Sequence, residues 1–163
     1  MILVCFGTRP EIIKLSPVIE ELKARNIKFK TVFTGQNKDI YQQFKNSIPT
    51  PDYWLDVMRM RSSLSDTVSS ILPKIDQIIA KNQARFLIIQ GDSPSTFACA
   101  LSAFHNKVPI GHVEAGLRTY NIYSPFPEEG YRQMLSKIVH LHWAPTIKAQ
   151  ENLIHEGIKN VIL

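Results

Sequence analysis

The sequence predicts an α/β fold with three layers, in which helices on both faces cover a parallel sheet of about seven strands. Hydrophobic runs of strand length alternate along the chain with stretches whose apolar residues recur every three or four positions. This alternation is typical of βαβ units, whose strands lie parallel. The chain has 163 residues, 44% of them hydrophobic, and no Pro-, Gly- or Ser-rich tract divides it. One domain with one buried core is therefore expected.

The first half of the chain is expected to supply three strands and three helices. The strands are apolar runs at residues 2–6, 29–33 and 53–57. The helices are predicted from the spacing of apolar residues at 10–25, 39–44 and 64–79. Pro73 falls inside the last of these patterns, where its ring and its missing N–H predict a kink or a break.

The second half continues the alternation. Strands are expected at residues 86–89, 108–113 and 141–144, and residues 160–163 look like the start of a seventh strand. Helices are expected at residues 96–105, 128–138 and 147–155. Cys5 lies in an expected strand and Cys99 in an expected helix, so both are predicted to be small core residues without a disulfide or a metal.

Composition narrows the classes of partner and the compartment. A net charge of +5, from 19 basic and 14 acidic side chains, favours anionic ligands in general. No basic run with interleaved aromatic residues is present, which argues against a nucleic-acid partner. No run approaches the roughly 18 apolar residues that span a bilayer, and the first residues lack the features of a signal peptide. A soluble, cytoplasmic protein with no membrane partner is expected.

The turn after the first expected strand, FGTRPE, has the chemistry of a helix start. Thr8 can cap the helix, and Glu11 three residues later can complete a capping box. On one interpretation this is only a capped helix. On the other, Gly7 lets the backbone approach a ligand, and free amides at the helix start act with Arg9 and Lys14 on a phosphate or carboxylate. The turn matches neither GxGxxG nor a Walker loop, so a dinucleotide or nucleoside triphosphate site is not supported.

Carboxylates follow the fourth and fifth expected strands. Asp92 comes just after the fourth strand and Glu114 just after the fifth. Asp92 is either a cap or turn residue, or a carboxylate aimed into a crevice above the sheet, where it would face Glu114. Carboxylates that converge in a partly dry cleft can divide acid and base roles between them. His140 and His142 have no evident third ligand, so no metal site is predicted.

The segment 112–132 interleaves charged and apolar side chains. Its ionisable residues include Glu114, Arg118, Glu128, Glu129 and Arg132. A partly buried, ordered loop holding ionisable groups and a surface loop with satisfied ion pairs both fit this composition, and the sequence leaves the two open.

Four ordered motifs resemble the N-terminal half of the non-hydrolysing UDP-N-acetylglucosamine 2-epimerases. They are GTRPEIIK, QGD, GHVEAGLRT and SPFPEE followed by Arg132, and the match covers essentially the whole chain. The resemblance implies a Rossmann-like domain of a two-domain GT-B fold, with the active site between the domains. It implies interconversion of UDP-N-acetylglucosamine (UDP-GlcNAc) and UDP-N-acetylmannosamine (UDP-ManNAc), by elimination of UDP to 2-acetamidoglucal and re-addition. Neither a nicotinamide cofactor nor a metal is implied.

The same resemblance assigns roles to particular residues. The family's catalytic carboxylates fall on Asp92, Glu114 and Glu128, and which of them is the base stays open. Its substrate-binding cations fall on Arg9, Lys14 and Arg132.

Further positions concern regulation and departures from the family pattern. A possible allosteric site for a second substrate molecule falls on Gln36 and Arg61, although Asp39 stands where the family has a further Gln. Tyr131 replaces an Asn and is expected to crowd the edge of the cleft. The motif GDSPST replaces GDTTT, and Ser93 is expected to preserve the helix cap.

The resemblance also bears on domain organisation. Residues 1–163 are expected to form the N-terminal domain, with the UDP-binding C-terminal domain absent from this chain. The chain alone is then expected to be inactive and to act with a C-terminal half in the same or another polypeptide, with a homodimer possible. The alternatives are a hydrolysing epimerase that releases N-acetylmannosamine and UDP, or a truncated, non-catalytic module that binds a sugar nucleotide or assembles with a partner.

Overall fold

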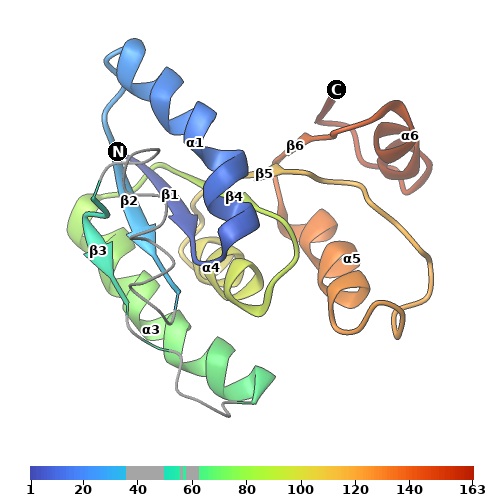
Figure 1. Cartoon of the computed structure of the whole chain (residues 1–163), viewed down its shortest axis with the longest axis horizontal. Coiled ribbons are helices and arrows are strands. Elements are labelled where there is room, and N and C mark those ends of the chain that lie inside the picture. The colour runs from blue at the N-terminus through green and yellow to red at the C-terminus, as the bar shows by residue number, and fades with distance from the viewer. Residues whose placement is uncertain (36–49, 56, 58–62) are drawn as a thin grey trace.

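A computed structural model describes residues 1–35, 50–55, 57 and 63–163. Within these residues seven strands form one sheet in the order β3-β2-β1-β4-β5-β6-β7, and all neighbouring pairs are parallel. The predicted parallel α/β fold is confirmed (Figure 1). The strands are β1 (Ile2–Phe6), β2 (Phe29–Phe33), β3 (Tyr53–Trp54), β4 (Phe86–Gln90), β5 (Ile110–Val113), β6 (Leu141–Trp143) and β7 (Val161–Ile162).

The helices follow the predicted order closely. They are α1 (Arg9–Ala24), α3 (Leu64–Asn82), α4 (Pro94–His105), α5 (Glu128–Ile138) and α6 (Ile147–His155). The helix expected at residues 39–44 lies outside the described residues. No helix in the described part of the chain is both long enough and apolar enough to cross a bilayer.

Of the kink or break predicted at Pro73, the break does not occur: α3 runs without interruption from Leu64 to Asn82. Pro73 is exposed, and so is Ser69, whose carbonyl loses its usual N–H partner four residues later. Water can solvate that carbonyl. The buried residues on the opposite side of the helix, Ile71 and Ile75 among them, pack against the core and hold the helix together.

Helices cover both faces of the sheet. On one face, apolar side chains of α1 pack against Val4, Phe6 and Ile88. On the other face, α3, α4 and α5 pack against the alternate residues of the same strands, such as Leu3 and Leu87. Each fully buried aliphatic side chain contributes on the order of 1.5–3 kcal/mol through the hydrophobic effect. Free thiols Cys5 and Cys99 are both buried, as predicted, in the second of these clusters.

The strand order places a crevice where ligands of such folds bind. From β1 the chain moves outward to β2 and β3, and then crosses to β4 and continues in the other direction. The connections from the neighbouring strands β1 and β4 therefore leave toward opposite edges. In open α/β sheets the ligand binds at such a switch point, beyond the carboxyl ends of the strands.

Candidate active site

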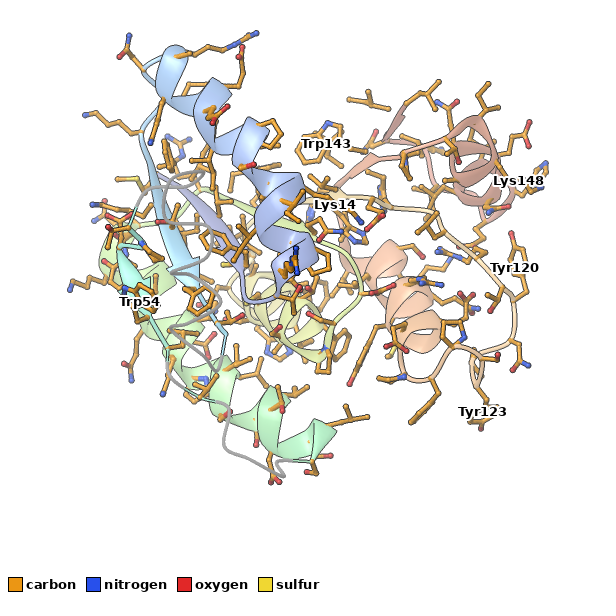
Figure 2. The ribbon with its side chains drawn as sticks, viewed as in Figure 1. Lys14, Trp54, Tyr120, Tyr123, Trp143 and Lys148 are labelled. Atoms are coloured by element: carbon orange, nitrogen blue, oxygen red, sulfur yellow. The ribbon has the colours of Figure 1, made fainter. Side chains whose placement is uncertain are left out.

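A cavity of about 310 Å³ opens at this switch point. Its walls come from the turns after β1, β4 and β5, the end of β4, and the N-terminal parts of α1, α4 and α5. Its ionisable and amide side chains are Glu11, Lys14, Gln90, Asp92, Glu114 and Glu128. The structure thus brings together the three predicted carboxylates and one predicted cation, and Figure 2 shows Lys14 on α1 near the centre of the molecule.

Both carboxylate oxygens of Glu114 are held. Nζ of Lys14 lies 2.5 Å from Oε1 of Glu114. Nε2 of Gln90, the last residue of β4, donates a hydrogen bond to Oε2. Glu114 itself has a φ of +69°, a left-handed conformation that is uncommon for a residue with a side chain. The chain therefore turns sharply as it leaves β5 and delivers this carboxylate to the cavity.

Asp92 is fixed from the other side by an arginine. Nε of Arg132 donates a 2.6 Å hydrogen bond to Oδ2 of Asp92, and Nη1 of the same guanidinium lies 3.3 Å from Oε2 of Glu129. Ser93, rather than Asp92, caps α4, because its Oγ accepts the N–H of Thr96 at 3.1 Å. The expected preservation of the cap is confirmed, and Asp92 is left for the cavity.

Glu128 differs from the other two carboxylates. It is the first residue of α5, it lines the cavity, and it makes no hydrogen bond or ion pair with any residue that the structure describes. The start of a helix favours negative charge through the helix dipole. Its carboxylate therefore has room to exchange hydrogen bonds with a bound molecule.

Glu11 occupies the amides that could have bound an anion at the start of α1. Oε2 of this buried carboxylate accepts the N–H groups of Gly7 at 2.5 Å and Thr8 at 3.1 Å. Oε1 accepts the hydroxyls of Ser93 at 2.7 Å and Thr96 at 3.2 Å. The amides of Gly7 and Thr8, just before this helix, are thus already bonded, and Glu11 fastens the turn after β1 to the turn after β4.

Gly7 is required by packing inside the protein. A Cβ at this position would lie 2.2 Å from Oγ1 of Thr34, in the turn after β2. Any side chain at position 7 would therefore collide with that turn.

The ends of β4 and β5 are fastened by His112. Its Nε2 lies 2.7 Å from the carbonyl oxygen of Gly91, and the N–H of Gly91 donates to the carbonyl of Val113 at 3.2 Å. Since a carbonyl only accepts, Nε2 carries the proton. Burial lowers the pKa of His112 to about 4, so the ring is neutral at pH 7. This ring fixes the turn that presents Asp92.

The segment after β5 is an ordered loop with buried ionisable groups, the first of the two possibilities left open by its composition. The side chain of Arg118 is 1% exposed and binds both oxygens of Glu156, at 2.6 and 2.9 Å. The side chain of Glu129 is fully buried and accepts the N–H groups of Thr119 and Tyr120, each at 3.1 Å. Only the outer part of the loop is exposed, as the positions of Tyr120 and Tyr123 show (Figure 2).

These contacts also set the ionisation of the two buried-loop carboxylates. Burial alone would raise the pKa of Glu129, but hydrogen bonds from Gln133, two backbone amides and Arg132 outweigh it and hold that pKa below its ordinary value. The ion pair with Arg118 likewise holds the pKa of Glu156 below its ordinary value. Both groups stay ionised at neutral pH and keep the loop attached to α5 and α6.

The remaining predicted residues have other outcomes. Arg9 is exposed at the first position of α1, between Thr8 and Pro10, which line the cavity. Tyr131, which was expected to crowd the edge of the cleft, does not line this cavity. The residue is 8% exposed and its ring stacks on Phe97, with centroids 4.9 Å apart.

Two further predicted residues, Gln36 and Arg61, lie outside the described residues. The predicted capping box is confirmed, because Oε2 of Glu11 accepts the N–H of Thr8. Sequence reasoning did not find the bond from Gln90 to Glu114 or the other three bonds to Glu11. For these contacts the sequence offered one signal, which is that Gln90 belongs to the motif QGD and Glu11 to the motif GTRPE.

Comparisons with known proteins agree on one family. The family model described as UDP-N-acetylglucosamine 2-epimerase matches residues 20–163. The UDP-N-acetylglucosamine 2-epimerase of Salmonella borreze is 42% identical over 99% of this chain, which covers 44% of that relative.

Solved structures lead to the same family. The chain superposes on the Neisseria meningitidis UDP-GlcNAc 2-epimerase bound to UDP-GlcNAc with a TM-score of 0.95 and 38% identity, covering 99% of this chain and 45% of that one. The Methanocaldococcus jannaschii UDP-GlcNAc 2-epimerase in complex with UDP-GlcNAc and UDP gives a TM-score of 0.90 and 32% identity, again over 99% of this chain and 45% of that one. The chain therefore spans a little under half the length of the relatives it matches.

Proposed function

Since the chain belongs to the UDP-N-acetylglucosamine 2-epimerase family, we propose that it is the N-terminal catalytic half of a non-hydrolysing epimerase that interconverts UDP-GlcNAc and UDP-ManNAc. The observation that carries the proposal is the position of Asp92, Glu114 and Glu128 around one cavity at the switch point of the sheet. Two relatives whose solved structures hold UDP-GlcNAc share this fold over nearly the whole chain.

The reaction needs acid and base groups rather than a redox partner. A base takes the proton from C2 of the sugar while the bond from C1 to the oxygen of UDP breaks, which leaves 2-acetamidoglucal, UDP and a protonated base. A proton is then delivered to the opposite face of C2, and UDP adds back to C1. Atoms and electrons balance without an oxidant, and the product differs from the substrate only at C2. Positioned carboxylates suit both proton transfers and the positive charge that develops at C1.

The contacts of the three carboxylates suggest how these roles divide. Asp92 and Glu114 are each held by a cation, Arg132 and Lys14 respectively. Such fixed, negatively charged groups are suited to stabilising positive charge at C1 as UDP leaves. Glu128 has no partner among the described residues, so its carboxylate is the one best able to take a proton and return it.

The charge of the cavity favours the sugar over the diphosphate. Four carboxylates, those of Glu11, Asp92, Glu114 and Glu128, line it, and among the described residues only two of them are paired with a cation, Asp92 with Arg132 and Glu114 with Lys14. A diphosphate placed among them would meet like charge, which costs free energy in a partly dry site. We therefore place the sugar ring in this cavity and the diphosphate outside it, toward Arg9 and a second wall supplied by a C-terminal half of the enzyme.

The proposal is tested by incubating the intact gene product with UDP-GlcNAc in D2O and following the products by ¹H NMR. The expected result is UDP-ManNAc, with deuterium at C2 of both sugar nucleotides. Free N-acetylmannosamine together with UDP would instead identify a hydrolysing epimerase. Binding of UDP-GlcNAc with no change in its spectrum over days would identify a non-catalytic module.

A further inference from the structure

Gln90 combines deep burial with a direct contact to the cavity. It is the last residue of β4 and is 2% exposed. In the parallel register of the sheet it stands opposite Val113, so the next residue along β5 is Glu114. From this position its Nε2 donates to Oε2 of Glu114.

This contact fixes the direction of the carboxylate in a way that Lys14 cannot. Lys14 is 42% exposed in its side chain and reaches Glu114 over a flexible stem of four carbons. Gln90 reaches it from a buried strand whose backbone is bonded on both sides. The left-handed φ of Glu114 means that strand alternation does not aim its side chain, so side-chain contacts must do so.

The other end of the same amide has no compensating contact. Oε1 of Gln90 is buried and has no hydrogen-bond partner among the residues that the structure describes. Turning the amide over would place Oε1 against a carboxylate oxygen of Glu114, with two acceptors facing each other. The amide is thereby held in an orientation that serves Glu114 and leaves a buried acceptor unsatisfied, which destabilises the fold.

We propose that Gln90 is a positioning residue that aims the carboxylate of Glu114 at the reacting carbons of the sugar. The proposal rests on the epimerase function proposed above. Its amide is oriented to donate to Glu114 at the expense of a bond for its own buried Oε1, which favours a role in the site.

The test compares three variants of the intact gene product with wild type, measuring kcat and KM for UDP-GlcNAc and the melting temperature. Gln90→Met keeps the length and volume of the side chain and removes both the donor and the unsatisfied acceptor. We expect kcat to fall about 10- to 100-fold, the scale of a misplaced catalytic group, with KM within about twofold. Its melting temperature should equal or exceed that of wild type.

Two variants serve as rescue and control. Gln90→His places a ring N–H at about the same reach, and should recover most of the lost kcat. Gln150→Met makes the same chemical change on α6, where the side chain is half-buried and outside the cavity, and should leave kcat and KM unchanged.

The outcomes separate the two proposals. A wild-type protein that does not epimerise overturns the epimerase function, and the role of Gln90 with it. An active wild type with a Gln90→Met variant of normal kcat overturns the positioning role alone. A lower melting temperature in Gln90→Met, with no rescue by Gln90→His, would make Gln90 a structural residue and also overturn the proposal.

Discussion

Nζ of Lys14 lies 2.5 Å from Oε1 of Glu114, which joins the first helix to the loop after β5 across 100 residues of sequence. The two side chains are 42% and 23% exposed. Pairs of this exposure contribute only about 0–1 kcal/mol to folding. The contact therefore contributes little to stability, and it gives Lys14 a partner within the cavity besides its predicted contact with the substrate.

A double-mutant cycle separates these two roles of Lys14. If Lys14 acts through Glu114, then Lys14→Met and Glu114→Gln should each lower kcat, and the double variant should lose little more than the worse single variant. Steady-state kinetics on the four proteins measures this coupling. Fully additive losses, with KM raised by Lys14→Met, would return Lys14 to direct contact with the substrate.

Removing the charge of each cavity carboxylate should reduce catalysis and spare the fold. Asp92→Asn, Glu114→Gln and Glu128→Gln should each lower turnover by about two to four orders of magnitude, the scale for a positioned acid or base. Circular dichroism should show unchanged secondary structure, because each substitution keeps size and shape. Glu151→Gln on the exposed side of α6 is the control. Near-normal turnover in all three variants would exclude these residues from the chemistry.

The buried ion pair of the loop should matter far more to stability than an exposed one. Glu156→Ala leaves Arg118, 1% exposed, with an uncompensated charge, which should cost about 3–5 kcal/mol. Glu21→Ala breaks the ion pair with Arg25. The side chains of Arg25 and Glu21 are 70% and 59% exposed, so this loss should cost less than about 0.5 kcal/mol. Urea denaturation measures both, and equal losses would contradict the burial argument.

Stability should fall with acid before the carboxylates titrate. The pKa of His112 is lowered by burial from 6.5 to about 4. Between pH 6.5 and pH 4 this imidazole is therefore protonated in the unfolded chain and neutral in the folded chain. Unfolding is thereby favoured as pH falls from 6.5 toward 4, by at most about 3 kcal/mol, and the contribution is flat above pH 7.

His112→Gln should flatten this slope without abolishing it, because burial also lowers the pKa of His142. Free energies of unfolding at pH 7, 6 and 5 test the prediction, with the exposed His105→Gln as control. A slope in His112→Gln that matches wild type would show that His112 is not the source.

The 163-residue chain alone should bind weakly and should not turn over. On the proposed two-domain arrangement it supplies one wall of a cleft, and a nucleotide sugar on one wall leaves the uridine and much of the diphosphate in water. The dissociation constant for UDP-GlcNAc should be on the order of millimolar or weaker. Hydrogen exchange at C2 in D2O should be undetectable by NMR without an added C-terminal half.

Light scattering on the same samples measures whether the chain forms a homodimer. Rapid exchange by a dimer would show that a second copy supplies the other wall of the proposed cleft. Rapid exchange by a monomer would show that the reaction does not need a second wall.

The sequence by itself determined the order and type of nearly every described element and the end of the sheet where the motifs gather. Apolar periodicity and caps such as Ser93 act within a few residues, so they can be read from a single chain. Local reasoning left a break possible at Pro73, but the helix continues there, because packing of the opposite face of α3 outweighs one missing hydrogen bond.

Only the tertiary structure decided the contacts between motifs that lie far apart in the sequence. Glu11 accepts the hydroxyls of Ser93 and Thr96, Gln90 and Lys14 hold Glu114, and Tyr131 stacks on Phe97. Glu114 lies 100 residues from Lys14 and 24 from Gln90 in the sequence, so no local pattern encodes their contacts. Strand order and the left-handed turn at Glu114 bring the three together, because parallel strands that are distant in sequence end side by side at one edge of the sheet.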